Sequence, residues 1–132
     1  MKHIIRALRG GEVIGLISDQ DAGSHGVFTD FFGRQASTPR GAAELTLKYG
    51  TPVMVSMTVR TSPGRYKTIY RDVEVREGDT VESLTERYNK VIENSVRLYP
   101  EQYFWMHRRW KTRPPSEKQQ AANSGPAGGE GA

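Results

Sequence analysis

Apolar and polar stretches alternate along the chain in a way that predicts a mixed order of helices and strands. Residues 2–9 have apolar positions at helical spacing and are followed by a Gly-Gly pair that should end the helix. Residues 13–17, VIGLI, are a continuous apolar run, which is typical of a strand buried on both faces. A polar loop, SDQDAGSHG, comes next and leads into an aromatic segment at residues 28–32.

The middle of the chain predicts one helix and two strands. Residues 39–49 have helical spacing, and Gly50 is placed to end that helix. Residues 52–59 form a second run rich in β-branched side chains. The SPGR sequence at residues 62–65 predicts a turn into a third strand at residues 66–75.

A long helix should follow this strand and end near Tyr99, before Pro100. Asp79 and Glu82 have the spacing of a capping box at its start. One face of the helix carries residues at helical spacing: Val81, Leu84, Tyr88, Val91, Ile92 and Ser95.

The order strand, helix, strand predicts a right-handed βαβ unit and therefore a small, mostly parallel sheet in an α/β fold. Ligand crevices in such sheets lie beyond the carboxyl ends of the strands. The loop after residue 17 leaves from such an end, so we expect Asp19, Gln20, Asp21 and His25 to face a crevice.

Length and composition predict one domain at residues 1–113 and a disordered tail at residues 114–132. The tail has no large apolar side chain, so burial cannot offset the entropy of ordering it. The chain has no cysteine, which rules out disulfides and thiolate metal sites. No apolar run approaches the roughly 20 residues of a membrane-spanning helix, and we expect neither a signal peptide nor an integral membrane protein.

Positive charge is concentrated near the end of the predicted domain. The net charge is +4, and the stretch HRRWKTR at residues 107–113 follows an aromatic YFW triplet. Basic side chains between aromatic ones suit an anionic membrane surface or a nucleic acid. A solvated helix end, where cations favour the carboxyl-terminal dipole, is an equal alternative on residue types alone.

His25 and Asp30 have the H-x-x-x-x-D spacing of glycerolipid acyltransferases, in which an acid orients a histidine that deprotonates a hydroxyl. Three histidines and 15 acidic residues give such a pair by chance in about one chain in three of this composition. The spacing alone is therefore a weak signal.

Two longer strings are more specific. GEVIGLISDQDAGSHGVFTDFFGRQASTPRGAAELTLKYGTPVMV resembles the middle of the bacterial lipid A biosynthesis acyltransferases, the lauroyl and myristoyl transferases, and PEQYFWMHRRWKTRP resembles their terminal signature. The resemblance covers residues 2–115 and implies part of a glycerolipid-acyltransferase-like fold. In that family the catalytic pair lies upstream of the DQD loop, so the resemblance implies that His25 and Asp30 are not that pair. The chain should correspond to the C-terminal part of the family and be inactive alone.

The family resemblance implies transfer of an acyl chain from acyl carrier protein, less often coenzyme A, to a hydroxyl of a lipid A precursor or related glycolipid, with no metal or cofactor. Asp19 falls where the family carries an acid beside the acceptor, with an Asx turn as its alternative role. Gln20 either adds a hydrogen bond there or is plain surface. Further candidates for substrate binding are Phe31 and Phe32, which could equally be core, Gly33 and Arg34.

The terminal string implies a peripheral site on the cytoplasmic face of the bacterial inner membrane. We expect the membrane-facing residues to be Trp105, Arg108, Arg109, Trp110 and Lys111. A separately made N-terminal half is a possible partner. Two other functions stay open: a non-catalytic membrane-docking or split-gene partner module, and a basic nucleic-acid-binding domain, which the resemblance makes the weaker of the two.

Overall fold

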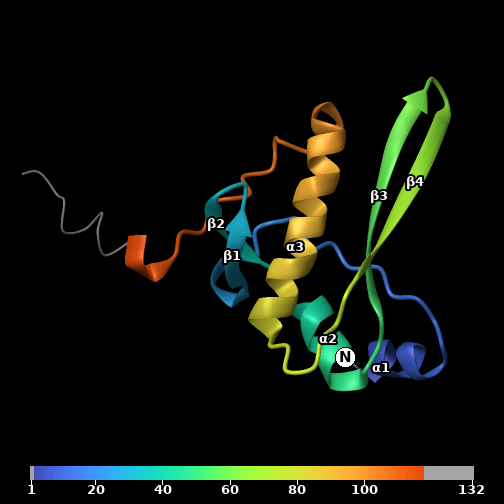
Figure 1. The fold of residues 1–132 in the computed structure, drawn as a ribbon, viewed down its shortest axis with the longest axis vertical. Helices are drawn as coiled ribbons and strands as arrows, with labels where there is room; N and C mark the ends of the chain where they lie inside the picture. Colours follow the sequence, from blue (N-terminus) through green and yellow to red (C-terminus); the bar gives the residue numbers. More distant parts are fainter. Residues whose placement is uncertain (1, 118–132) are drawn as a thin grey trace, which may run out of the picture.

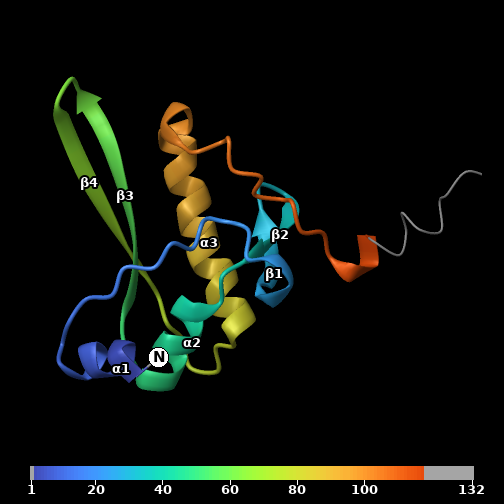
Figure 2. The ribbon, with the colours of Figure 1, turned by 180° about the vertical axis from the view of Figure 1, so that it is seen from behind.

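The computed structural model describes residues 2–117 and places one long helix, α3, between two β-hairpins (Figures 1 and 2). The hairpin β1–β2 lies on one side of α3 and the longer hairpin β3–β4 lies on the other. The strands and α3 have these bounds: β1 Val27–Phe31, β2 Arg34–Thr38, β3 Val53–Ser62, β4 Arg65–Val73 and α3 Val81–Leu98.

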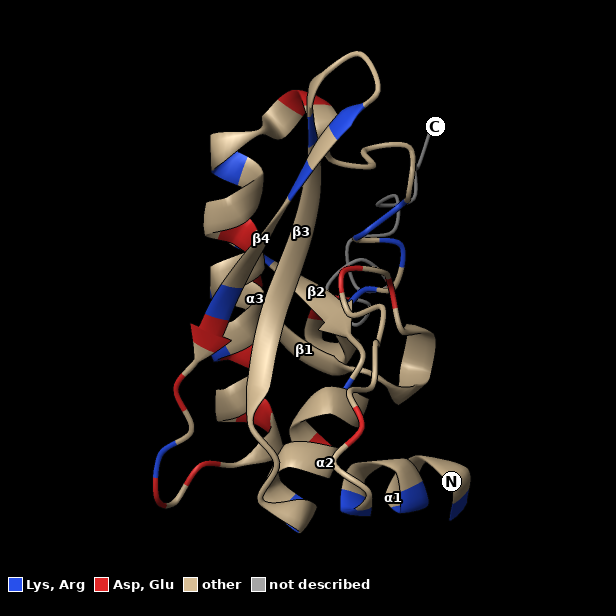
Figure 3. Cartoon of the chain, turned by 90° about the vertical axis from the view of Figure 1, so that its right-hand side faces the viewer, with Lys and Arg blue, Asp and Glu red and all other residues tan. Residues whose placement is uncertain are grey.

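The described chain also contains four shorter elements, and residues 115–117 form a further helical turn. Helix α2 packs against α3, and basic side chains line α1 (Figure 3). Their bounds are α1 Lys2–Arg9, the 3-10 turn η1 Gly23–His25, α2 Gly41–Tyr49 and the 3-10 turn η2 Pro100–Gln102. Among residues 2–117, no helix is both long and apolar enough to cross a membrane.

Both sheets are two-stranded and antiparallel, so the prediction of a small, mostly parallel sheet is wrong for the described residues. The predicted first strand, residues 13–17, is not a strand, and Val13 and Ile17 are 95% and 71% exposed. A strand needs a neighbour for its backbone N–H and C=O groups. Within residues 2–117, each strand pairs with the other strand of its own hairpin. The predicted βαβ unit therefore does not form.

Several other sequence predictions are confirmed. Helix α1 has the predicted bounds, and α2 ends at Gly50, which has φ of 64°. The turn at residues 62–65 joins β3 to β4, and α3 ends just before Pro100. The capping box is displaced by one residue: Thr80 caps α3 with Ser83, because the carboxylate of Asp79 is bound by Arg87. Residues 118–132 of the predicted tail lie outside the described residues.

Helix α3 has two buried faces of different character. One face packs Leu84 and Tyr88 against Ala43 of α2 and Val73 of β4, which forms the apolar core. The other face is a buried polar stripe at i, i+4 spacing, made by Thr85, Asn89 and Glu93, and it lies against β1. The polar stripe fixes the position of the β1–β2 hairpin, as its contacts show.

Candidate substrate-binding surface

The DQD loop, residues 19–21, is held by the terminal segment, residues 103–113. The hydroxyl of Tyr103 donates a hydrogen bond of 3.2 Å to the backbone carbonyl of Asp19. The backbone N–H of Asp21 donates to Nε2 of His107 at 2.8 Å. Burial, and then the nearby charge of Asp19, raise the pKa of Tyr103 to about 12, so its hydroxyl stays a donor at neutral pH.

The two carboxylates of the DQD loop have different environments. The carboxylate of Asp21 accepts hydrogen bonds from the backbone and hydroxyl of Thr112, at 3.1 and 2.8 Å, and from the backbone of Gly23 at 3.1 Å. The carboxylate of Asp19 accepts none from the part of the chain that the structure describes, and the residue is half-buried. Gln20 beside it is exposed. Asp21 therefore anchors the loop, and Asp19 is available to a ligand.

Arg109 does not lie at the surface, contrary to the sequence prediction. It is 1% exposed and donates to the carbonyl of Ser37 and the hydroxyl of Thr38, both at 2.6 Å. Its guanidinium also lies 5.2 Å from the ring centre of Phe31. Burial lowers the pKa of Arg109. Arg109 thus ties the terminal segment to the end of β2 and cannot meet a membrane.

An aromatic cluster joins the hairpin to the terminal segment. Phe31 is completely buried, with ring centres of Phe32, Trp110 and Tyr103 at 4.8, 5.8 and 6.2 Å. Phe31 is therefore core, which answers one of the alternatives left open by the sequence. Trp110 is half-buried and packs on Phe31, and the ring centres of Phe32 and Trp105 are 6.1 Å apart.

The turn between β1 and β2 consists of Phe32 and Gly33, both with positive φ, at 55° and 78°. Two-residue hairpin turns of type I′ need this backbone, which is unfavourable for a bulky residue such as Phe32. The turn is stabilised by two carboxylates. Asp30 accepts from the N–H of Gly33 at 3.2 Å, and Glu93 accepts from the N–H of Phe32 at 2.9 Å.

Glu93 is the centre of a charged network under this turn. Its other carboxylate oxygen accepts from Lys90 at 2.9 Å and from Arg97 at 2.6 Å. Arg97 lies 4.7 Å from the ring centre of Phe32. Burial raises the pKa of Glu93, but the three donors outweigh it and hold that pKa at about 2. The network orients the Phe32 side chain beside the exposed Gly33 and Arg34.

His25 and Asp30 do not form a catalytic pair in this structure. His25 is exposed and its Nδ1 lies 3.4 Å from the hydroxyl of Ser24, while Asp30 is occupied by the hairpin turn. Within residues 2–117, no histidine side chain hydrogen-bonds to a carboxylate. The same residues contain no group of three or more side chains suited to hold a metal ion.

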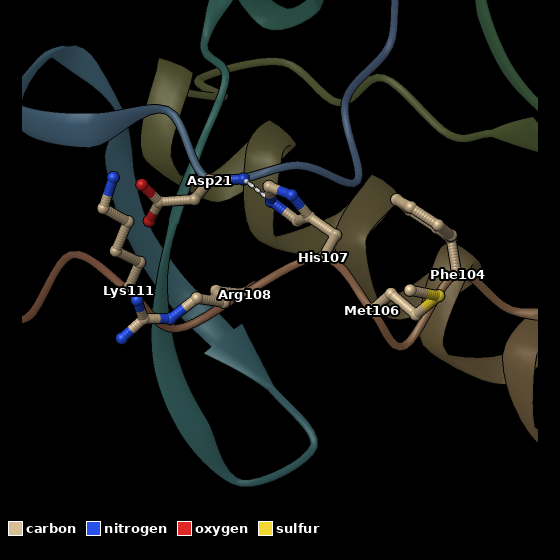
Figure 4. Close-up of a pocket in the computed structure, with 6 residues that line it drawn as sticks. All are labelled: Asp21, Phe104, Met106, His107, Arg108 and Lys111. Atoms are coloured by element: carbon tan, nitrogen blue, oxygen red, sulfur yellow. Dashed lines mark hydrogen bonds between the residues drawn. The ribbon is translucent and has the colours of Figure 1, made fainter.

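A shallow hollow of about 390 Å³ lies where the DQD loop meets the terminal segment. Figure 4 shows Asp21 and His107 at its centre, joined by their hydrogen bond. Phe104 and Met106 lie on one side of this pair and Arg108 and Lys111 on the other. The hollow therefore has an apolar wall and a basic wall.

The two sequence strings that carry the family resemblance thus meet in one surface. Residues 1–112 match the family model for the bacterial lipid A biosynthesis acyltransferases. The chain belongs to this family. Membership confirms the resemblance stated from the DQD and PEQY strings.

Curated relatives agree with this assignment. The chain is 36% identical over 118 residues to the lipid A biosynthesis lauroyltransferase of Escherichia coli (strain K12), covering 86% of this chain and 39% of that protein. It is 33% identical over 120 residues both to the palmitoleoyltransferase of the same strain and to a lipid A biosynthesis acyltransferase of Shigella flexneri, covering 89% of this chain and 39% of each relative. The chain thus spans about two fifths of the length of these acyltransferases.

Sequence reasoning missed the side chains that hold the surface together. The sequence places Asp21 at a crevice but has no local signal for its role as an anchor or for its partner Thr112. Glu93 was also missed, although a usable signal existed. Thr85, Asn89 and Glu93 repeat every four residues beside the apolar face of α3, which is the pattern of a second buried face.

Proposed function

We propose that this chain forms the acceptor-side part of an acyltransferase of lipid A biosynthesis. The reaction transfers a fatty acyl chain from acyl carrier protein to a hydroxyl of a lipid A precursor or related glycolipid. The observation that supports the proposal is the arrangement of the DQD loop, in which Asp21 is fully engaged and Asp19 is left without a hydrogen-bond partner among residues 2–117. A carboxylate held at such a rim suits a sugar hydroxyl.

Neighbouring residues have complementary roles in this proposal. Gln20 adds a neutral hydrogen bond at the same rim as Asp19. Phe32 offers an apolar face to an acyl chain, held in position by Glu93 and Arg97. Gly33 has no side chain and so leaves space for a ligand at the turn. Arg34 is exposed beside it and binds a phosphate, either of the glycolipid or of the prosthetic arm of acyl carrier protein.

The proton-transfer step is assigned to another part of the longer enzyme. General-base catalysis requires a histidine within hydrogen-bond reach of the acceptor hydroxyl and an acid to orient it. His25 is exposed and its spaced partner Asp30 is used by the hairpin turn. We therefore propose that the base and its acid lie in a region equivalent to the part of the curated relatives that this chain does not match. Because the acceptor is a lipid, the site of action is the cytoplasmic face of the bacterial inner membrane.

Two substitutions test the assignment of Asp19. The chain is co-expressed with the part of the Escherichia coli lauroyltransferase outside the matched region, and acyl transfer to a lipid A precursor is measured. Asp19→Asn should lower kcat/KM by roughly 10- to 100-fold, since it removes a charged hydrogen bond. His25→Ala is the matched control and should change the rate less than about two-fold, as expected of a solvent-facing side chain.

The opposite ranking would contradict the proposal. Strong loss in His25→Ala with little change in Asp19→Asn would restore the pair of His25 and Asp30 as the catalytic base and acid. Circular dichroism of both variants verifies that the fold is retained. We expect it to be retained in Asp19→Asn, because the Asp19 carboxylate accepts no hydrogen bond from residues 2–117.

A further inference from the structure

Three consecutive large side chains project from the terminal segment without covering the core. Phe104, Trp105 and Met106 are 59%, 50% and 85% exposed. Leu98, at the end of α3, is another exposed apolar side chain, at 64%. Single exposed apolar residues are common on protein surfaces, but consecutive large ones are typical of a contact with a protein, a ligand or a membrane.

This apolar tip, residues 104–106, has a defined shape. The backbone N–H of His107 donates to the carbonyl of Phe104 at 3.1 Å, which closes a turn around the tip. The indole N–H of Trp105 donates to the carbonyl of Pro100 at 2.6 Å, and its ring packs edge-on against Tyr103 at 4.8 Å. The exposure is therefore a property of an ordered turn, in which Trp105 is anchored at one edge.

Two exposed cations lie beside the apolar tip. Arg108 and Lys111 border the same shallow hollow as Phe104 and Met106, as Figure 4 shows. Neither cation forms an ion pair within residues 2–117. The acid that borders the same hollow is Asp21, whose carboxylate is occupied by Thr112 and Gly23.

We infer that residues 104–111 dock the chain on an anionic lipid bilayer, with Phe104 and Met106 inserted among the acyl chains, Trp105 at the interface and Arg108 and Lys111 on lipid phosphates. Apolar side chains next to an aromatic residue and to cations match the layers of a bilayer surface in that order. A nucleic acid would use the cations but has no apolar phase for Met106. This surface is independent of Asp19 and of the acyl-transfer proposal.

The inference corrects the membrane-facing set expected from the sequence. Arg109 and Trp110 are not part of the proposed docking surface, because Arg109 is bound to the end of β2 and Trp110 packs on Phe31. Phe104 and Met106 replace them. The basic string HRRWKTR thus separates into exposed cations that meet lipid and one buried cation that holds the segment in place.

Fluorescence of a single tryptophan tests the insertion directly. Trp110→Phe leaves Trp105 as the sole indole and removes no hydrogen bond seen within residues 2–117, where the Trp110 N–H has no partner. Vesicles containing phosphatidylglycerol should shift the Trp105 emission to shorter wavelength, and brominated acyl chains in those vesicles should quench it. Unchanged emission with no quenching would overturn the inference.

Matched variants separate the contributions of the tip and the cations in vesicle co-sedimentation. The pair Phe104→Ser and Met106→Ser should weaken binding at least several-fold, while Met54→Ser and Tyr70→Ser, whose side chains are also exposed, on the β3–β4 hairpin, should leave it unchanged. Replacing Arg108 and Lys111 with Gln should weaken binding by about five-fold for each cation removed. The same change at Arg65 and Lys67 of β4 is the control.

Three outcomes would contradict the docking surface. The first is equal binding to neutral phosphatidylcholine vesicles and to anionic ones. The second is tighter binding to duplex DNA than to lipid. The third is loss of vesicle binding when the complementing part of the lauroyltransferase is present, because the apolar tip would then be covered by protein. Persistence of binding in that complex supports the inference.

Discussion

Glu93 shows how one buried carboxylate links α3 to the hairpin that carries the FFG string. Its side chain is 1% exposed and receives the N–H of Phe32 together with the cations of Lys90 and Arg97. The hydrogen bond to Phe32 stabilises a left-handed backbone at a residue that disfavours it. Removing the charge should therefore loosen the turn as well as the ion pairs.

The depressed pKa of Glu93 predicts a specific pH dependence of stability. A carboxyl whose pKa falls from its ordinary value of 4.5 to about 2 on folding stabilises the folded state above pH 4.5, and this contribution is lost as the pH falls toward 2. Glu93→Gln should lower the free energy of unfolding by about 1–3 kcal/mol at neutral pH. In urea titrations the difference between wild type and variant should shrink on acidification, and a constant difference from pH 7 to pH 2 would refute this role.

Single-residue environments were the part of the site least accessible from sequence. The DQD and HRRW strings lie in two segments that the structure brings into contact, and Trp105, Arg108 and Lys111 are exposed. Four cations in HRRWKTR look alike in sequence, however, and Arg109 differs from its neighbours through its hydrogen bonds to Ser37 and Thr38, about 70 positions away. Long-range partners of this kind have no local signature.

Among the elements, helices and the β3–β4 hairpin followed local patterns, whereas the β1–β2 hairpin did not. In β1, every second side chain is buried, at Val27, Thr29 and Phe31. The turn that follows is Phe-Gly, however, and not the Asn-Gly or Asp-Gly that is typical of a type I′ hairpin. The apolar run at residues 13–17 had the composition of a buried strand without a pairing partner in the described chain. Pattern identifies a strand, but pairing decides whether it forms.

Gly26 provides a test of how closely the β1–β2 hairpin packs on the loop before it. A Cβ at this position would lie 2.2 Å from the hydroxyl oxygen of Ser37 and 2.9 Å from the carbonyl of Thr38. Gly26→Ala should therefore lower the free energy of unfolding by about 1–3 kcal/mol through overpacking.

Gly41→Ala is the control for Gly26→Ala. Nothing lies within 4 Å of a Cβ at Gly41, the first residue of α2, so alanine there should be neutral or stabilise the chain by about 0.5–1 kcal/mol. Thermal unfolding of the two variants measures both effects. Equal melting temperatures would contradict the close approach at Gly26.

At the scale of the whole molecule, several large apolar side chains lie exposed among residues 2–117. Val13 and Ile17 are exposed within the strand-like run at residues 13–17, and Met54, Tyr66 and Tyr70 are exposed on the β3–β4 hairpin. The curated relatives are longer, and this chain spans 39% of each. Unpaired backbone groups can hydrogen-bond to a further strand, and the exposed apolar side chains can pack against it.

Acyl transfer by the complemented chain tests the central claim most directly. The chain alone should transfer no labelled acyl group from acyl carrier protein to a lipid A precursor. Co-expression with the part of the lauroyltransferase outside the matched region should raise solubility and produce transfer, provided that part keeps its own H-x-x-x-x-D/E sequence. Turnover by the purified chain alone that disappears in His25→Ala would contradict the account.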